Sequence, residues 1–294
     1  MVGDNASHRK RGNAFESSRL ADAGWDRMES RARRWAAGGL LLGAVLGVVA
    51  FAPARWLASS ITEATGHRLT LAQAQGTLWN GSALVMLTGG PGSKDASVLP
   101  GRLKWRLGLR GLGMVLQADH ACCLDGTLEI EWARTWSTSR LKVMPQGTAI
   151  GRWPNPWLAG LGTPWNTLQL GGSTRLIATG LQFENRGQGW VMQGQLDAEM
   201  MGVSSRISPL PVLGNYRLSV LGDASGATLG QLRLSTMDGP LQLSANGDWG
   251  RKGLRLLGEA RAATPNDLPA LQNLLNIIGR RDGDRSVLSI GSPT

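Results

Sequence analysis

The sequence predicts a mainly β protein, with one N-terminal transmembrane helix followed by an antiparallel β-rich domain that has a short C-terminal helix. An uncharged apolar stretch at residues 36–52 predicts the first helix. From residue 67 onward, short runs of alternating apolar and polar residues, separated by Gly, Asn, Asp and Pro, predict many antiparallel strands. The expected parts are a segment at 1–34, the transmembrane helix at 35–54 and the β-rich domain at 55–294.

The N-terminal segment mixes Ser, Asn, Gly and both charges with few apolar residues, so we expect no stable fold there. The chain has 31 Lys and Arg against 21 Asp and Glu, and this net charge of +10 excludes an acidic solvating chain. Arg27, Arg31, Arg33 and Arg34 gather just before the apolar stretch. Attraction of this basic end to anionic headgroups explains the charge without nucleic acid.

The apolar stretch lies between Trp35 and Trp56, which are suited to the two membrane interfaces. At about 1.5 Å per residue it reaches most of a roughly 30 Å hydrocarbon core. Arginines crowd its N-terminal side, whereas only Arg55 follows closely. The positive-inside rule therefore places the N-terminus in the cytoplasm and the residues beyond Pro53 on the other side of the membrane.

Two alternatives exist for this stretch. Ala50-Phe51-Ala52 resembles the small-x-small site of a cleaved signal peptide, and cleavage would release the β-rich domain from its tether. The charged region before it is longer than is usual for a signal peptide, and Pro53 would follow the cut directly. A buried helix of a soluble protein is the second alternative, but it does not explain the flanking Arg and Trp.

Gly39, Gly43 and Gly47 recur at four-residue spacing and lie on one helical face. Small residues at this spacing let a second helix approach closely, which predicts a homodimer or pairing with another membrane helix. The alternative is that Gly is simply common in membrane helices.

A short helix is expected directly after the apolar stretch. Pro53 suits its first position and Gly66 its end, and an apolar side is formed by Trp56, Leu57, Ile61 and Ala64. Near the C-terminus, Thr264 and Pro265 predict the start of a second helix that ends near Gly279. Its apolar stripe consists of Leu268, Leu271, Leu274, Leu275 and Ile278.

Alternation is clearest in Arg102–Leu107, which has a basic face, and in Thr127–Trp132, which has an acidic face. We expect these two rows of charge to pair across neighbouring strands. Further strands are expected at 69–74, 78–87, 167–170, 174–178, 190–198, 216–221, 231–236, 241–245, 254–260 and 286–290. Turn chemistry is supplied by Asn80-Gly81, Asp125-Gly126, Asp238-Gly239 and Asn246-Gly247.

No set of residues predicts catalysis, a cofactor or a metal site. The histidines His8, His67 and His120 are scattered, and no phosphate loop, nucleophile elbow or dinucleotide fingerprint occurs. Asp119-His120 lies near Cys122, but we interpret it as a surface pair. We therefore expect a protein that is not an enzyme.

Cys122 and Cys123 are the only cysteines, and because they are adjacent they cannot link distant parts of one chain. Outside the cytoplasm they could form a vicinal disulfide ring, stay reduced or bridge to a second molecule. The ring, which would fix the turn before Asp125-Gly126, is the interpretation we prefer, with a redox switch as a functional alternative.

The chain has 12 Trp against one Tyr and three Phe. Trp79, Trp105 and Trp132 fall on apolar strand faces and are expected in the core, whereas Trp153, Trp157 and Trp165 lie in a Pro-rich stretch expected to cover the sheet. Aromatic rings beside Arg can bind single-stranded nucleic acid, but a location outside the cytoplasm argues against that partner.

Several segments together resemble the type II secretion system protein N family. The most specific strings are GTLWNGSA at 76–83 and LGTPWNTL at 161–168. The other segments are Pro53–Leu57, Leu99–Trp105 and Leu274–Gly283. The resemblance covers most of the chain from residue 35 onward, but the charged N-terminal extension and the two cysteines have no match in it.

The resemblance implies a non-catalytic inner-membrane component of the machine that exports folded proteins from the periplasm of Gram-negative bacteria. It implies a single-pass protein with a periplasmic β-rich domain, acting as a scaffold toward other inner-membrane and periplasmic components. The family is also distantly similar to AsmA-like proteins, which implies a lipid-binding or lipid-transfer groove as the alternative, with membrane lipid as the partner.

Overall fold

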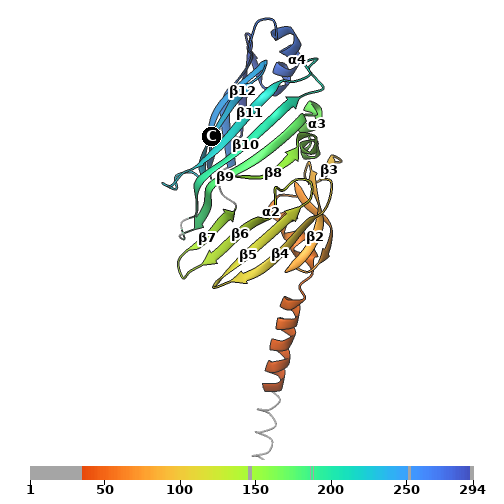
Figure 1. Ribbon diagram of the computed structural model, residues 1–294, viewed down its shortest axis with the longest axis vertical. Helices are drawn as coiled ribbons and strands as arrows, with labels where there is room; N and C mark the ends of the chain where they lie inside the picture. Colours follow the sequence, from red (N-terminus) through yellow and green to blue (C-terminus); the bar gives the residue numbers. More distant parts are fainter. Residues whose placement is uncertain (1–34, 145–147, 186, 188, 251–252, 292–294) are drawn as a thin grey trace, which may run out of the picture. The chain divides into compact units, whose positions relative to one another are not determined.

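The computed structural model describes residues 35–144, 148–185, 187, 189–250 and 253–291, so the expectation for residues 1–34 lies outside the described residues. The chain forms two compact units, Met1–Ala52 and Pro53–Thr294. In the first unit, residues 35–50 are helical (Figure 1), whereas the transmembrane helix was predicted over residues 35–54. Across the described residues, no helix has both the length and the apolar character needed to cross a membrane.

The second unit consists mainly of one antiparallel sheet, which confirms the predicted β-rich domain (Figure 1). The first half of its strands are β1 (Leu69–Gly76), β2 (Asn80–Thr88), β3 (Ala96–Val98), β4 (Leu103–Arg110), β5 (Gly113–His120), β6 (Leu128–Arg134), β7 (Ser139–Met144) and β8 (Ala149–Pro154). The second half are β9 (Gly171–Asn185), β10 (Trp190–Ser204), β11 (Gly214–Gly222), β12 (Gly230–Asp238), β13 (Leu241–Gly250), β14 (Gly253–Ala262), β15 (Arg280–Asp282) and β16 (Arg285–Ile290). The helices are α2 (Ala54–Ala64), the 3-10 helix η1 (Asn155–Leu161), α3 (Trp165–Leu168) and α4 (Leu268–Ile278).

The order of strands in the sheet follows the chain closely, because most strands pair with the next strand through a hairpin. The order is β1-β2-β4-β5-β6-β7-β9-β10-β11-β12-β13-β14-β16-β15, with β3 added to β2 and β8 added to β9. β9 pairs with β7 near Asn185 and with β8 near Gly171, so it joins the two halves of the sheet.

The two edge strands of this path differ from their neighbours. On β1, the pairing register with β2 shifts between Ala72 and Gln75, and Gln73 in this bulge has a positive φ of 50°. At the other edge, β15 has only three residues, Arg280, Arg281 and Asp282, and all three are charged. Neither edge therefore presents a long regular strand.

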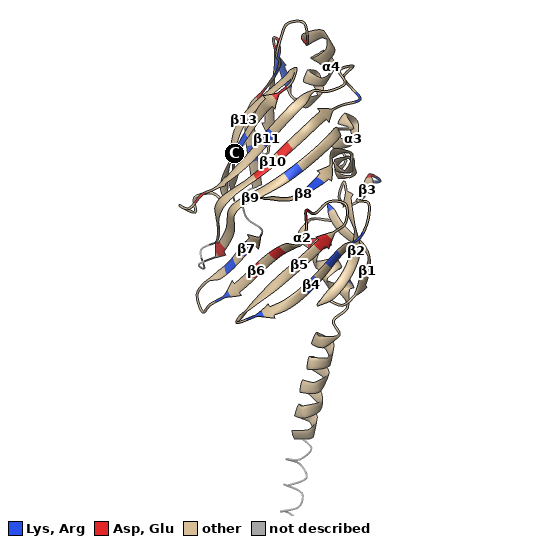
Figure 2. Cartoon of the chain, viewed as in Figure 1, with Lys and Arg blue, Asp and Glu red and all other residues tan. Residues whose placement is uncertain are grey.

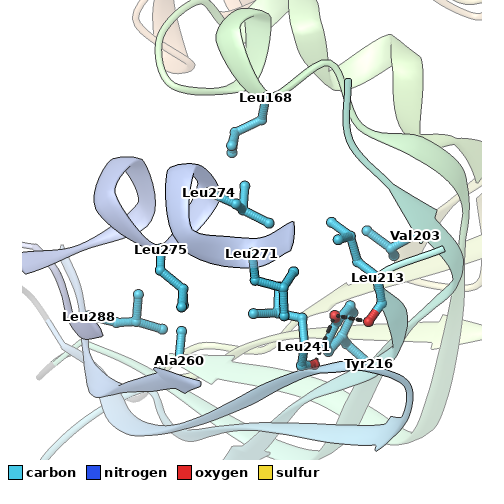
Figure 3. Close-up of a cluster of buried hydrophobic side chains, with 10 residues drawn as sticks. All are labelled: Leu168, Val203, Leu213, Tyr216, Leu241, Ala260, Leu271, Leu274, Leu275 and Leu288. Carbon is cyan, nitrogen blue, oxygen red and sulfur yellow. Dashed lines mark hydrogen bonds between the residues drawn. The ribbon is translucent and has the colours of Figure 1, made fainter. Parts of the chain in front are cut away.

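Three clusters of buried side chains form the core of this unit. The first lies under α2 and includes Ala54, Leu71 and Trp105, and the second joins β7 to β9–β14 through residues such as Met192 and Leu232. The third lies under α4, as Figure 3 shows. Its buried members are Leu168, Val203, Leu213, Tyr216, Leu241, Ala260, Leu271, Leu274, Leu275 and Leu288.

Both helices predicted in this unit are present, with corrections. α2 packs through Ala54, Leu57, Ala58 and Ile61. Trp56 is 49 % exposed and Ala64 is also exposed, so these two predicted members do not belong to the buried side. α4 begins at Leu268 with Asp267 at its N-cap position, so Thr264 is not the cap. The Thr264 hydroxyl donates a hydrogen bond to the Asp267 carboxylate. The predicted apolar stripe of α4 is confirmed.

One predicted strand is wrong. Residues 167–170 do not form a strand, because Trp165–Leu168 makes one helical turn that ends at Gln169 in the left-handed conformation. Strands β3, β5, β7, β8 and β15 were not expected. Their alternation is short or interrupted by consecutive apolar residues, which leaves a weak period-two signal. Asp125-Gly126 lies in the turn after β5, and Asp238-Gly239 lies where β12 ends, as predicted. Asn80-Gly81 begins β2 and Asn246-Gly247 lies inside β13, so neither pair forms a turn.

The predicted pairing of charged rows on β4 and β6 is also wrong, because β5 lies between these strands. Arg110, at the end of β4, reaches across β5 instead. Its guanidinium donates a 2.5 Å hydrogen bond to Glu131 and lies 3.8 Å from Glu129. One Arg at the strand end thus contacts both acidic side chains of β6.

Candidate functional site

The predicted helix-pairing glycines lie within the helical residues 35–50. A Cβ placed on Gly39, Gly43 or Gly47 would meet no atom within 4 Å, so these positions have open space around them. Helical residues four apart share one face, as the pairing hypothesis requires. The pairing itself stays a prediction.

The two cysteines lie in a tight corner where β5 ends. Cys123 is buried at 2 % exposure, Cys122 is exposed, and their sulfur atoms are in contact. The Cys123 carbonyl accepts a 3.0 Å hydrogen bond from the N–H of Arg152 on β8. A Cβ on Gly151 would collide with that same carbonyl oxygen, so only glycine fits there. The contact between the sulfurs is compatible with the predicted ring, whose formation stays a prediction.

His120 is the last residue of β5 and belongs to the same corner. It is only 4 % exposed, so the interpretation of Asp119-His120 as a surface pair is wrong for the histidine. Its Nδ1 accepts a 3.4 Å hydrogen bond from the Cys122 N–H, which leaves the proton of the neutral ring on Nε2. That Nε2 has no hydrogen-bond partner among the described residues. Burial lowers the pKa of His120, so the imidazole is held neutral.

His120 lies close to two other side chains that can bind a metal, which was not expected from the sequence. In the part of the chain that the structure describes, a ring nitrogen of His120 and the sulfurs of Cys122 and Cys123 lie within 4.8 Å of one another. Thiolates are required for coordination, and a disulfide between these two cysteines would remove both. His120, Cys122 and Cys123 can therefore act together as metal ligands only when the two cysteines are reduced.

A buried carboxylate connects three strands on the opposite half of the sheet. Glu199 on β10 is 5 % exposed and is bonded by Arg175 on β9 and by Arg217 on β11, the latter at 2.8 Å. Hydrogen bonds from Arg175 and then from Arg217 lower the pKa of this carboxyl below its usual value. Figure 2 shows acidic and basic positions side by side on β9 and β10. The group joins side chains of three neighbouring strands.

A cleft with a volume of about 620 Å³ lies between η1 and the loop that follows β10. The hydroxyl groups of two serines that line it are used by the fold. Ser205 donates a 2.6 Å hydrogen bond to the carbonyl of Leu168, and Ser208 donates to the carbonyl of Ala270 at 3.2 Å. These serines therefore have structural roles.

A family model described as type II secretion system, protein N, matches residues 67–288. The chain belongs to this family. The matched residues run from the start of the sheet into β16, and they include α4, the Cys122–Cys123 corner and the Arg175–Glu199–Arg217 group. Gly39, Gly43 and Gly47 lie outside the matched range.

No curated protein and no solved structure matches the chain. Membership of the protein N family makes the chain a component of type II secretion, and the resemblance noted from its sequence strings is confirmed. The Arg175–Glu199–Arg217 group was missed from the sequence because the two arginines lie 24 and 18 residues from Glu199 and meet it only through strand register. The environment of His120 was missed because β5 was not expected.

Proposed function

We propose that this chain is a non-catalytic, membrane-anchored scaffold of the type II secretion system that supports the export of folded proteins from the periplasm. The observation that carries the proposal is the family match over residues 67–288, which includes nearly the whole sheet. The partners would be other inner-membrane and periplasmic components of the system. The sheet would supply the contact surface, because it is the main structure of the matched range.

The proposed location is the bacterial inner membrane, with the N-terminus in the cytoplasm and the Pro53–Thr294 unit in the periplasm. This rests on the apolar residues 36–52 and on the asymmetry of charge around them, with Arg33 and Arg34 before and only Arg55 close behind. The face formed by Gly39, Gly43 and Gly47 would let two copies of the helix pair.

The bonding of the polar groups in this fold is explained better by a scaffold function than by catalysis. Glu199 is neutralised by two arginines, and Ser205 and Ser208 are bonded to backbone carbonyls. A catalytic group has to be free to exchange protons or to attack a substrate. Side chains that are fully bonded within the fold stabilise it instead.

The lipid-binding groove is the weaker proposal. A groove for acyl chains needs an apolar surface that is open to the ligand. In the second core cluster, apolar side chains of β9–β14 such as Ala178, Met192 and Leu232 are at most 3 % exposed, so protein atoms already cover them. Mass spectrometry of the purified chain that finds stoichiometric phospholipid within this unit would reverse this preference.

The scaffold is tested by crosslinking the full chain in secreting cells, extracting it in mild detergent and identifying the proteins that co-purify. We expect inner-membrane and periplasmic components of the system. Their absence from crosslinked material, with the chain itself recovered intact, would contradict the scaffold.

Helix pairing is tested separately with the double variant Gly43→Leu and Gly47→Leu. Because the bulky side chains block close approach of two helices, we expect loss of the crosslinked homodimer. Gly38→Leu is the matched control, since Gly38 lies next to Gly39 and outside the shared face. Equal dimer yields in the double variant and the control would contradict pairing through this face.

A further inference from the structure

Two neighbouring hairpin turns carry apolar side chains that the fold leaves in solvent. Leu112, in the turn between β4 and β5, is 99 % exposed, and Trp136, in the turn between β6 and β7, is fully exposed. Leu109, at the end of β4, is 78 % exposed. We call these two turns and the strand ends that carry them the hairpin tips. Single exposed apolar residues are common, but such side chains gathered at one place mark a contact surface.

The pairing of the strands brings the hairpin tips together. Arg110 pairs with Gly113 across the first turn, Gly113 pairs with Ala133 on the next strand, and Arg134 pairs with Ser139 across the second turn. The two turns are therefore adjacent at one end of the sheet, and Figure 1 shows the β4–β5 and β6–β7 turns side by side. Leu112 and Trp136 project from the same end.

The fold does not need either side chain. Gly111, with a φ of +59°, supplies the left-handed conformation of the first turn. The second turn is closed by the hydrogen bond from the Thr135 N–H to the Thr138 carbonyl at 2.8 Å, and the two threonine hydroxyls also bond to each other. Because backbone and threonine atoms make both turns, Leu112 and Trp136 are free to serve a contact.

Arginines surround the apolar tips. Arg110 and Arg140 are each more than half exposed although they pair with Glu131 and Glu184. Arg134 is exposed, and no ion pair of its side chain is found among the described residues. Figure 2 shows basic positions at these strand ends. A guanidinium has five N–H donors, so an Arg that bonds one carboxylate can still bind a phosphate.

The chemistry of the hairpin tips fits a membrane surface better than a protein partner. A stable protein interface buries about 800 Å² on each side, whereas an aromatic side chain such as Trp136 buries only about 150–250 Å². A bilayer has no such minimum for a chain that is already anchored, because tethering raises the effective concentration. Trp is enriched at the headgroup level, and Arg is attracted to anionic lipid.

We propose that the hairpin tips insert Leu112 and Trp136 into the headgroup region of a bilayer that contains anionic phospholipid, with Arg110, Arg134 and Arg140 bound to lipid phosphates. The proposal rests on the proposed function in one respect, since the membrane anchor at residues 36–52 holds the Pro53–Thr294 unit near a bilayer. The contact would fix the orientation of the sheet relative to the membrane.

The test places a photo-crosslinking amino acid at position 112 or 136 of the full chain, reconstituted in vesicles of phosphatidylethanolamine and phosphatidylglycerol. Position 212 is the matched control, because Val212 is also exposed, at 45 %. It lies in the loop between β10 and β11, at the end of the sheet opposite the hairpin tips. We expect lipid adducts at 112 and 136 at least five times more abundant than at 212. Equal yields at all three positions would overturn the proposal.

The charge component is tested with Arg134→Gln in the same vesicles and in vesicles of phosphatidylcholine alone. We expect the unmodified chain to form more adducts with the anionic vesicles, and Arg134→Gln to reduce this preference two- to five-fold. An unchanged preference would contradict the role of Arg134. Arg152→Gln serves as a control, because Arg152 is exposed on β8, away from the hairpin tips.

Crosslinking in intact cells separates this proposal from the scaffold. Adducts of positions 112 and 136 with another protein, in place of lipid, would overturn membrane contact and assign the hairpin tips to a protein partner. Lipid adducts without co-purifying secretion components would leave membrane contact supported and count against the scaffold. Co-purification of secretion components without lipid adducts would support the scaffold and overturn membrane contact.

Discussion

The two ends of the sheet use the same kinds of side chain in opposite ways. At the end covered by α4, Leu271, Leu274 and Leu275 are between 0 and 2 % exposed. At the hairpin tips, Leu112 is 99 % exposed and Trp136 is fully exposed. The difference is the presence of a helix that covers the strand ends. Apolar residues therefore contribute to stability at the α4 end, whereas at the hairpin tips they remain available for contact.

The largest effect is expected from Leu271→Ala at the α4 end. Leu271 is fully buried in the third core cluster, so the substitution removes apolar contacts and leaves a cavity. We expect a loss of about 3–4 kcal/mol in the free energy of unfolding. Urea unfolding followed by tryptophan fluorescence measures it. A loss below about 1 kcal/mol would show that α4 does not seal this end.

A smaller loss is expected from Tyr216→Phe beneath the same helix. The Tyr216 hydroxyl lies 3.0 Å from the carbonyl oxygen of Leu213 and 3.1 Å from that of Leu241, and Figure 3 shows both hydrogen bonds. Burial is the main cause that raises the pKa of Tyr216, so the hydroxyl stays protonated and donates. Its removal should cost about 1 kcal/mol in the same unfolding assay. A variant more stable than the unmodified chain would mean that the hydroxyl is not needed to hold the end of the β10–β11 loop at Leu213.

The next effect depends on pH and tests the corner at the far end of β5. Burial lowers the pKa of His120, so the unfolded chain binds a proton more readily than the folded chain does. Stability from the neutral ring is complete above the unfolded pKa of about 6.5 and is lost as pH falls through the folded pKa. We expect His120→Gln to flatten the decline in melting temperature between pH 7 and pH 5. An equally steep decline in the variant would show that titratable groups other than His120 cause the loss of stability.

The smallest effect is expected at the hairpin tips. Leu112→Ser and Trp136→Ser remove side chains that touch little of the fold, so the free energy of unfolding should change by less than about 0.5 kcal/mol. The comparison with Leu271→Ala, measured under the same conditions, isolates the effect of burial. A loss above about 1 kcal/mol at either position would place that side chain against the fold and would weaken the proposed membrane contact.

Much of the fold could be predicted from local patterns. The alternation in Arg102–Leu107 correctly placed Trp105 in the core, and the leucine spacing of α4 correctly gave its buried stripe. These succeed because each pattern has one period and one buried face. Trp79 and Trp132, also predicted in the core, are only half-buried. Trp56 was misplaced because the side of α2 that is buried depends on the strands beneath it.

The sites were harder to predict because they depend on contacts between distant parts of the chain. Glu199 lies between two arginines only because β9, β10 and β11 pair in one particular register. Gln169 ends a helical turn where a strand was expected, and the cause is a Pro-rich sequence that breaks the regular pattern. Cys122 and Cys123 lie together because they are adjacent in the sequence, and the ring between them stays a prediction.

The irregular edges of the sheet affect how this protein behaves at high concentration. An open antiparallel sheet exposes unpaired N–H and C=O groups at both borders, and a second molecule could add its own strand there. The bulge at Gln73 distorts one border, and the short charged run Arg280–Asp282 ends the other. Both features oppose edge-to-edge association, so a sheet of sixteen strands can stay a discrete unit without closing on itself.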